Sequence, residues 1–418
     1  MIPMGKKAIA IIATLDTKGP EAAFVKERIE SSGYPTVLLD TGILARRDLS
    51  APPPDVPADE IAREGGEDRS DLIAKSSEKE TRNRGIRAMS EGSAKILKGL
   101  YDEGRIGAVI GLGGAQGTEI STFAMRALPI GVPKMMVSTV ASGQTPFGIY
   151  TGTRDITIMH SVVDILGLNS LTRCVLANAA AAIVGMASTA PLECLRSGLR
   201  VGITLYGQTT PAGLAIKPQL EAKGCEVFAF HSNGTGGKAM EELAVEGMLD
   251  ALFDLSTHEI TDEIFGGIHA SDGTRLLAGG LKGVPRLVVP GGLDLITLRE
   301  PESVPEIYRS QPFVRHNPHI TLVRLTREQM VRVAEVMAAR LNQARAPVVV
   351  AIPLGGWSFY NRDGLHFRDV DADRSFVETL RNRLRPEIPV REIQGHVNDP
   401  PFISEILALF EDLMKAPR

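Results

Sequence analysis

The stretch VIGLGGAQGTEI, residues 109–120, decides the fold of this chain. An apolar run ends there in glycines, and Thr118 and Glu119 then open a segment with a helical pattern. A buried strand, a glycine turn and a helix form the repeating unit of α/β proteins with parallel sheets. The glycines have two interpretations: they let the chain turn tightly, or their N–H groups form a nest for a phosphate.

Strand-like and helix-like segments alternate on both sides of this stretch. In the first half the pattern predicts a helix at 20–32 and strands at 6–13, 36–40, 108–112 and 134–138. A second series predicts a helix at 327–342, opened by a capping box of Thr326 and Gln329, and strands at 201–205, 226–230, 251–255, 286–289, 348–352 and 389–392. We therefore expect an α/β protein of two Rossmann-like, doubly wound domains with mainly parallel sheets, at residues 1–192 and 198–418.

Composition excludes several classes of protein. The 418 residues carry a formal net charge of −4 with both signs interspersed, so we expect no nucleic-acid partner. No apolar run approaches the roughly 20 residues of a membrane-spanning helix, so we expect no membrane partner. Three scattered cysteines without metal-ligand spacing indicate ordinary buried thiols and a cytoplasmic protein.

Residues 44–70 interrupt the alternation with a proline-rich, acidic sequence that has few apolar residues. We expect a long exposed excursion there, which acts either as a lid or partner surface or as a plain solvated loop. Residues 71–104 have a helical pattern, and the alanines at 177–190 predict a tightly packed helix.

The loops that follow the strands are the places to search for a site, because ligands of open α/β sheets bind beyond the carboxyl ends of the strands. The first loop, ATLDTKGPE at 13–21, carries Asp16, Thr17 and Lys18. Lysine offers a point charge to a phosphate, and Asp16 could hold Mg²⁺ through water. The alternative is that Asp16 or Thr17 only caps the following helix.

The opening stretch matches neither standard nucleotide motif. Gly111, Gly113 and Gly117 make a pattern one residue longer than the dinucleotide fingerprint, and no lysine follows Gly117 as in a P-loop. Four glycines in seven residues still exceed the need of one turn, which keeps the phosphate nest open beside the packing turn. With the next loop, STVASGQT at 138–145, the candidate phosphate-binding residues are Gly113, Gly114, Gly117, Thr118, Ser138, Thr139, Ser142 and Gly143.

The second half contains three further stretches with reactive side chains. FHSNGTGGKAMEEL at 230–243 resembles half of a P-loop and could bind an anionic group with His231 and Lys238 nearby. RHNPHITLVR at 315–324 and GHVNDP at 395–400 place histidines beside Asn or Asp, which suits acid–base catalysis or metal binding. A lone histidine is more often structural. The catalytic candidates are His231, Lys238, His316, Asn398 and Asp399.

Six motifs occur along the chain in the order ATLDTKG, GLGGAQGT, STVASGQT, HSNGTGGKAME, HNPHITLVR and HVNDPPF. Together they resemble the family of the tomato-mosaic-virus resistance protein, which is an ATP-binding inhibitor of viral RNA replication. The family also has many bacterial members. The resemblance implies two Rossmann-like domains, ATP and Mg²⁺ bound by the first, and a homo-oligomer. The longer plant proteins carry a further barrel-type domain after this region, for which we expect no counterpart here.

The chain departs from the family pattern at Ala13, where glycine is usual, and at Ala115 and Gln116, where the loop is often richer in glycine. A Cβ at these positions restricts the close approach of the backbone to a phosphate.

These features favour a nucleotide-dependent enzyme. ATP would lie on the N-terminal sheet edge against residues 16–18 and 113–118, and a small polar metabolite would occupy the interdomain cleft. Phosphoryl transfer or ATP-assisted ligation is then the expected reaction. Two alternatives stay open: an ATP-sensing regulatory module without turnover, and an ATP-independent hydrolase or lyase of a carboxylated metabolite.

Overall fold

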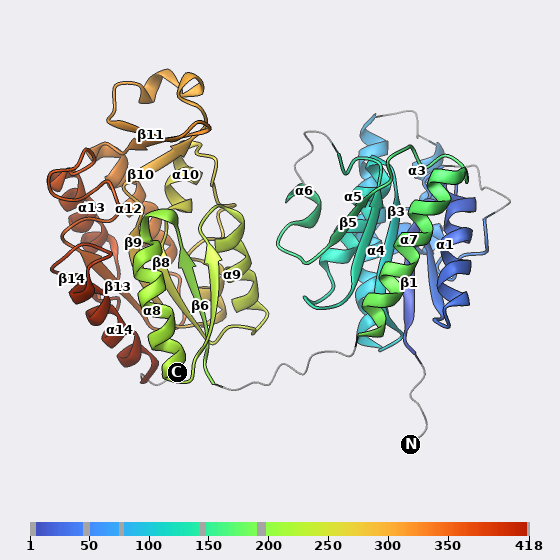
Figure 1. Ribbon diagram of the computed structural model, residues 1–418, viewed down its shortest axis with the longest axis horizontal. Coiled ribbons are helices and arrows are strands. Elements are labelled where there is room, and N and C mark those ends of the chain that lie inside the picture. Colours follow the sequence, from blue (N-terminus) through green and yellow to red (C-terminus); the bar gives the residue numbers. More distant parts are fainter. Residues whose placement is uncertain (1–5, 45–50, 75–78, 143–147, 190–197, 416–418) are drawn as a thin grey trace. The chain divides into compact units, whose positions relative to one another are not determined.

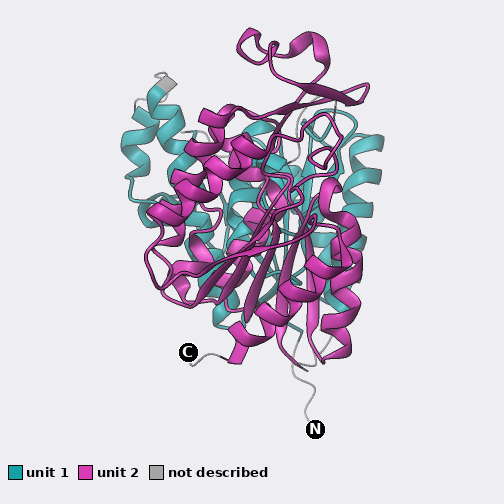
Figure 2. Ribbon diagram, turned by 90° about the vertical axis from the view of Figure 1, so that its left-hand side faces the viewer, with its two compact units in different colours: residues 1–194 teal, residues 195–418 magenta. Residues whose placement is uncertain are grey.

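The computed structural model describes residues 6–44, 51–74, 79–142, 148–189 and 198–415. The chain divides into two compact units, Met1–Cys194 and Leu195–Arg418, which are coloured separately in Figure 2. Each unit contains its own parallel sheet and its own hydrophobic cores.

The sheet of the first unit has five parallel strands in the order β2-β1-β3-β4-β5. Its strands are β1 (Ala8–Ala13), β2 (Thr36–Asp40), β3 (Ile106–Gly113), β4 (Lys134–Ser138) and β5 (Thr157–His160). Every residue of β1 and β4 is buried, as expected for apolar runs covered on both faces. The edge strand β5 is partly exposed and was not predicted.

Helices cover both faces of this sheet (Figure 1). Ile9 and Ile11 of β1 pack with α1 (Gly19–Ser31) and α7 (Ser170–Ser188). Ala10 and Ile12 point the other way, toward α2 (Ala58–Glu64), α4 (Lys79–Asp102) and α5 (Ala115–Arg126). This alternation follows from the two-residue period of a strand. The short helices α3 (Arg69–Ala74) and α6 (Gly148–Thr151) complete the unit.

The expectation of an exposed excursion at 44–70 is corrected over its second half. Helix α2 lies against α4, and its residues Ile61 and Ala62 are fully buried. The contact is a close one, since a Cβ on Gly92 would lie 1.9 Å from the carbonyl oxygen of Ile61. Two buried side chains and a glycine contact therefore hold this polar segment on the domain. Residues 45–50 lie outside the described ranges.

Two statements drawn from composition are also corrected, the length of the apolar runs and the burial of the cysteines, while the absence of a membrane partner stays a prediction. Within the described residues, α7 is the one helix that is long and apolar enough, by length and composition, to cross a membrane. Its residues Leu176, Ala179 and Ile183 pack in the core of the first unit. Cys174 is exposed on this helix and Cys225 is half-buried, so neither is an ordinary buried thiol.

The sheet of the second unit has six parallel strands in the order β14-β13-β9-β8-β6-β7. Its strands are β6 (Arg200–Leu205), β7 (Glu226–His231), β8 (Ala251–Ser256), β9 (Arg286–Gly291), β13 (Val348–Pro353) and β14 (Val390–Ile393). Val289 faces α8 (Thr210–Ala222) and α14 (Pro400–Lys415). Val288 faces α12 (Arg327–Leu341) and α13 (Val370–Arg383).

The other elements of this unit are shorter. They are α9 (Thr235–Val245), α10 (Glu259–Phe265), α11 (Ala278–Lys282) and the 3₁₀ turns η1 (Gly207–Thr209), η2 (Pro301–Ser303) and η3 (Glu306–Tyr308). A small antiparallel sheet, which was not predicted, contains β10 (Leu295–Leu298), β12 (Ile320–Arg324) and β11 (Phe313–Asn317). The capping box of Thr326 and Gln329 is confirmed at the start of α12.

The predicted fold class, α/β with two domains and mainly parallel sheets, is confirmed. In the first sheet β1 lies between β2 and β3, and in the second sheet β6 lies between β7 and β8. In both sheets the first strand along the chain is thus flanked by the second and the third. The strand order therefore reverses between β1 and β3, and again between β6 and β8. Such switch points open a crevice beyond the strand ends, and ligands of doubly wound folds bind there.

Candidate functional sites at two switch points

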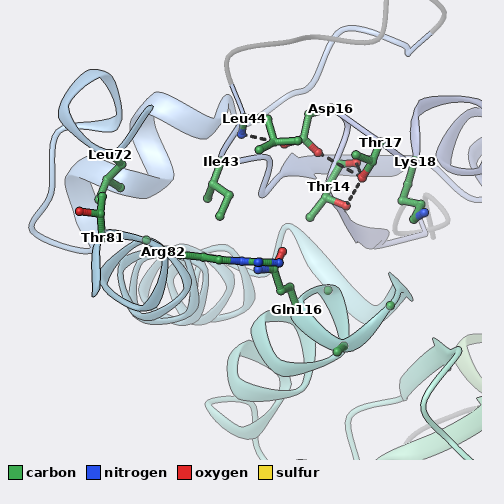
Figure 3. A pocket seen from close by; sticks show the side chains of 14 residues that line it. Thr14, Asp16, Thr17, Lys18, Ile43, Leu44, Leu72, Thr81, Arg82 and Gln116 are labelled. Carbon is green, nitrogen blue, oxygen red and sulfur yellow. Dashed lines mark hydrogen bonds between the residues drawn. The ribbon is translucent and has the colours of Figure 1, made fainter. Parts of the chain in front are cut away.

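The first unit has a pocket of about 540 Å³ at its switch point. The loop after β1 forms one wall and the loop after β3 forms another (Figure 3). Part of α4 and the segment after β2 complete it. The lining residues are Thr14, Asp16, Thr17, Lys18, Ile43, Leu44, Leu72, Thr81, Arg82, Gly85, Gly114, Ala115, Gln116 and Gly117.

Two helices begin at this pocket without a side-chain cap. Lys18 precedes α1 and Gly114 precedes α5, and neither position provides a capping hydrogen bond. By contrast, Asn169 and Thr326 cap α7 and α12 with their side chains. The first-turn N–H groups of any helix lack partners inside it, and they carry the positive end of the helix dipole. Pro20 in the first turn of α1 has no N–H to offer, whereas Ala115, Gln116 and Gly117 of the first turn of α5 line the pocket. The N-terminus of α5 therefore gives the pocket donors that suit an anion.

Arg82 adds a charge that the sequence interpretation missed. It lies on α4, and Figure 3 shows its side chain extending toward Gln116. With the Gln116 amide turned to pair with it, the amide oxygen accepts from Arg82 Nε at 2.6 Å and from Nη2 at 2.9 Å. Nothing in the sequence marks this arginine, because a single arginine on a polar helix is ordinary.

Asp16 and Thr17 are held within the pocket wall. Asp16 Oδ2 accepts the N–H of Leu44 at 2.9 Å, and Asp16 Oδ1 accepts the Thr17 hydroxyl at 3.2 Å. The Lys18 ammonium donates a hydrogen bond to the carbonyl oxygen of Ile165. This carbonyl is therefore the partner of the lysine at the position where a phosphate was expected. Burial raises the pKa of the neighbouring Asp40, and the charge of Asp16 raises it further.

The four glycines at the end of β3 and the start of α5 have different roles. A Cβ on Gly113 would lie 2.9 Å from Cα of Gly117, and one on Gly111 would lie 2.5 Å from Cβ of Ser121. These two glycines therefore allow α5 to lie close against β3. Gly114 and Gly117 line the pocket.

The hydroxyl groups of the two later loops, which were expected to bind a phosphate, do not line the pocket. Thr118 is fully buried, and its hydroxyl lies 2.7 Å from that of Ser138. Thr139 and Ser142 are not among the residues that line the pocket, and Gly143 lies outside the described residues.

In the second unit the GTGGK loop already holds an anion from its own chain. The N–H groups of Gly234 and Gly237 donate to Glu259 Oε1 at 2.9 Å and 3.0 Å. Glu259 Oε2 accepts from Arg275 Nε at 2.7 Å, and both side chains are fully buried. Lys238 pairs with Asp272 at 2.7 Å. The nest predicted for an external anion therefore contains a buried carboxylate.

The other three catalytic candidates lie at separate places. His316 is exposed on β11 of the small antiparallel sheet. The Asn398 side chain joins the loop before α14 to the β6–α8 loop, through Gln208 O at 2.9 Å. Asp399 accepts the N–H of His396 and an N–H of Arg362, each at 2.8 Å. Asn398 and Asp399 thus have clear structural partners.

The switch point of the second unit gathers a different set of side chains. Tyr206 follows β6 and His258 follows β8, and their rings stack with centroids 4.3 Å apart. His231, the one predicted catalytic residue near this group, stacks on Tyr206 at 6.0 Å. Asp262 and His269 complete the group. The motif THEITD at 257–262 could have indicated it, because His258 and Asp262 are one helical turn apart.

The surroundings shift the pKa values of three of these residues. Burial lowers the pKa of His258, but the adjacent Asp262 carboxylate outweighs this effect, so the net shift is upward. Burial, together with the nearby histidines 258 and 231, lowers the pKa of His269 to about 4. Burial also raises the pKa of Tyr206 well above its ordinary value. At neutral pH the side chains of His269 and Tyr206 are therefore uncharged.

Comparison with known proteins assigns the chain to a family. The model of the Uncharacterised protein family (UPF0261) N-terminal domain matches residues 7–191, and that of the C-terminal domain matches residues 199–414. The chain belongs to the UPF0261 family. A UPF0261 protein of Clostridium tetani is 38% identical over 397 residues, which are 95% of this chain and 96% of that protein. A UPF0261 protein of Rhizobium meliloti is 36% identical over 97% of this chain and 99% of its own length.

The UPF0261 chain is also related to a plant protein. The ToMV resistance protein Tm-1 of Solanum lycopersicum is 34% identical over 340 residues, which are 80% of this chain and 45% of the plant protein. The plant protein is therefore the longer one. Among solved structures, a thioesterase domain from the curacin biosynthetic pathway matches 52% of this chain at 11% identity with a TM-score of 0.25, too weak a likeness to support an argument.

Proposed function

We propose that the first unit binds ATP with Mg²⁺ in the pocket at its switch point. The proposal rests on one convergence: the uncapped N-terminus of α5 and the Arg82 guanidinium meet at a pocket of about 540 Å³, beside Lys18 at the start of α1. Backbone N–H groups and an arginine fork are donors that suit phosphate oxygens. The volume also falls within the usual range of small-molecule sites.

Each wall of the pocket would have its own task. The first turn of α5 and Arg82 would hold phosphate oxygens, and Asp16 would provide a carboxylate for Mg²⁺, which is often bound through one or two carboxylates and waters. Ile43, Leu44 and Leu72 give the pocket an apolar side that suits a base ring. Bound Mg²⁺ would neutralise phosphate charge. The motif order, which resembles an ATP-binding family, favours ATP among the nucleotides.

We further propose that the nucleotide serves turnover of a small polar metabolite. The supporting observation is the group of histidines 258 and 269, Asp262 and Tyr206 at the second switch point. A protein that only senses ATP has no need of such a group. ADP release, measured with sugar acids and hydroxy acids as co-substrates, separates the two functions. If no added metabolite stimulates ADP release, the result would favour the regulatory module.

The first test is a thermal-shift measurement with ATP, ADP, NAD and NADP, each with and without Mg²⁺. A ligand at 100 times its Kd adds about 2.7 kcal/mol to stability, which is roughly 5–10 °C in Tm for a domain of this size. We expect this shift with MgATP. A shift with NAD but none with ATP would overturn the proposal.

The matched variants are Arg82→Ala and Arg87→Ala. Both arginines lie on α4, but Arg87 is 79% exposed and pairs with Glu91 on the surface. Loss of a charge-assisted phosphate contact costs about 1.5–3 kcal/mol, so Arg82→Ala should weaken ATP binding by at least tenfold. Arg87→Ala should leave it unchanged. Equal affinity of both variants for ATP would remove Arg82 from the site.

A further inference from the structure

We propose that the second unit binds a divalent transition-metal ion through His258, Asp262 and His269. One potential ligand atom from each of these residues lies within 4.8 Å of the others. His258 Nε2 is 3.3 Å from Asp262 Oδ2. The three residues come from one short stretch that contains α10 and the loop after it, so a single piece of backbone fixes their spacing.

The ring of His258 is oriented as in a metal ligand. Its Nδ1 lies 2.9 Å from the carbonyl oxygen of Gly292, an acceptor that fixes the proton on Nδ1. Nε2, the other ring nitrogen, lies on the side of Asp262 and is the atom that would bind the metal. A histidine that ligates a metal almost always donates its other N–H to a carbonyl or carboxylate in this way.

The carboxylate of Asp262 is also held from outside the cluster. Its Oδ1 accepts the N–H of Thr297, and its Oδ2 accepts the N–H of His269, each at 2.9 Å. Both oxygens keep further lone pairs, because a carboxylate has about four acceptor sites. Asp262 is fully buried. A buried carboxylate beside two imidazoles is a donor set for which a cation supplies the missing charge.

His269 has a nitrogen that remains unsatisfied. Its Nδ1 is buried and has no hydrogen-bond partner within the described part of the chain. A buried polar atom without a partner destabilises the folded state. A metal ion on this ring would remove that cost.

Thr297 is a competitor for the proposed ligand atom. Its hydroxyl lies 2.8 Å from His258 Nε2, but also 2.9 Å from the hydroxyl of Tyr206. The threonine would therefore keep the Tyr206 hydroxyl as a hydrogen-bond partner when Nε2 binds a metal. The hydrogen bond between Thr297 and Nε2 belongs to the metal-free chain.

The donor set indicates the class of metal and of its further ligands. Two imidazoles and one carboxylate suit Zn²⁺ or Fe²⁺ and leave coordination positions open. His269 is only partly buried and His231 beside Tyr206 is exposed, so the open positions lie on the solvent side. An oxygen ligand, either water or a carboxylate or hydroxyl group of a small polar metabolite, would complete the shell there.

The test uses the full chain, stripped with a chelator and then titrated separately with Zn²⁺, Mn²⁺, Co²⁺ and anaerobic Fe²⁺. Bound metal is counted by mass spectrometry after gel filtration, and Co²⁺ is followed by its visible absorption. We expect one ion per chain and a Co²⁺ spectrum typical of nitrogen and oxygen ligands. Failure of all four ions to bind the wild-type chain would overturn the proposal without any variant.

Three variants locate the ion. Asp262→Asn and His269→Gln should each lower metal affinity by at least about 100-fold, since even outer partners of a metal ligand contribute 10–100-fold. His319→Gln is the control, because that side chain is 82% exposed on the β11–β12 hairpin. Circular dichroism checks folding. If the buried Asp262→Asn does not fold, His269→Gln decides, because His269 lies partly at the surface. Unchanged metal binding by folded His269→Gln would overturn the assignment.

Discussion

At the scale of single residues, Gly113 at the end of β3 and Gly114 after it show why the sequence of this loop allowed two interpretations. Gly113 is required for packing, because its Cβ would meet the backbone of Gly117 at 2.9 Å. Gly114 has room, since its Cβ would lie 3.6 Å from the Thr139 hydroxyl at an ordinary φ of −80°. The loop is thus a packing turn at one position and a pocket wall at the next.

This difference gives a prediction for two adjacent substitutions. Gly113→Ala should lower the free energy of unfolding by about 1–3 kcal/mol, the usual cost of overpacking against a fixed backbone. Gly114→Ala should lower it by less than about 1 kcal/mol, because only a cap preference changes. Urea denaturation of both variants measures the difference. Equal losses would mean that the contact at Gly113 does not constrain the loop.

Several residues of both sites could not be read from the sequence. Asp16 and Thr17, which line the pocket, could be proposed from the sequence because they follow a clear apolar strand. The end of a strand is a local signal in the sequence. Arg82 and Glu259 reach their partners from distant helices, which only the folded chain brings near. The GTGGK loop therefore looked like an empty anion nest, although Glu259 was available to fill it.

At the scale of elements, predictions were accurate where an apolar pattern was strong. Strand β4 has its predicted bounds, and the capping box of α12 is confirmed. The hairpin of β11 and β12 was missed, because β11 is mostly exposed and polar and has no apolar alternation to read. Helix α2 was missed because its seven residues are largely charged, and its burial depends on a glycine of another helix.

Helix α4 provides a matched pair of glycines that tests this contact. Gly92→Ala would place a Cβ 1.9 Å from the Ile61 carbonyl oxygen, so α2 must move away. Gly99→Ala has nothing within 4 Å and should stabilise the helix by roughly 0.5–1 kcal/mol. We expect Gly92→Ala to lose hydrogen-exchange protection over residues 58–64. Retained protection there would show that α2 does not depend on close approach to α4.

At the scale of the whole molecule, the same strand order occurs in both units, and each candidate site lies where that order reverses. The alternating pattern predicted doubly wound domains with mainly parallel sheets, but the residues gathered at each reversal differ. The first unit presents the N-terminus of α5 and an arginine, which suit an anion. The second presents imidazoles and a carboxylate, which suit a cation. Under the two proposals, sheets with the same strand order at their switch points would bind ligands of opposite charge in one chain.

This contrast predicts separate responses in scanning calorimetry. Each unit has its own hydrophobic cores, so we expect two unfolding transitions. MgATP should raise the midpoint of one transition and Zn²⁺ that of the other, each by roughly 5–10 °C at 100 times its Kd. Arg82→Ala should remove only the first response and His269→Gln only the second. If one ligand shifted both transitions equally, the two sites would be energetically coupled, and binding of each ligand would have to be described as a property of the whole chain.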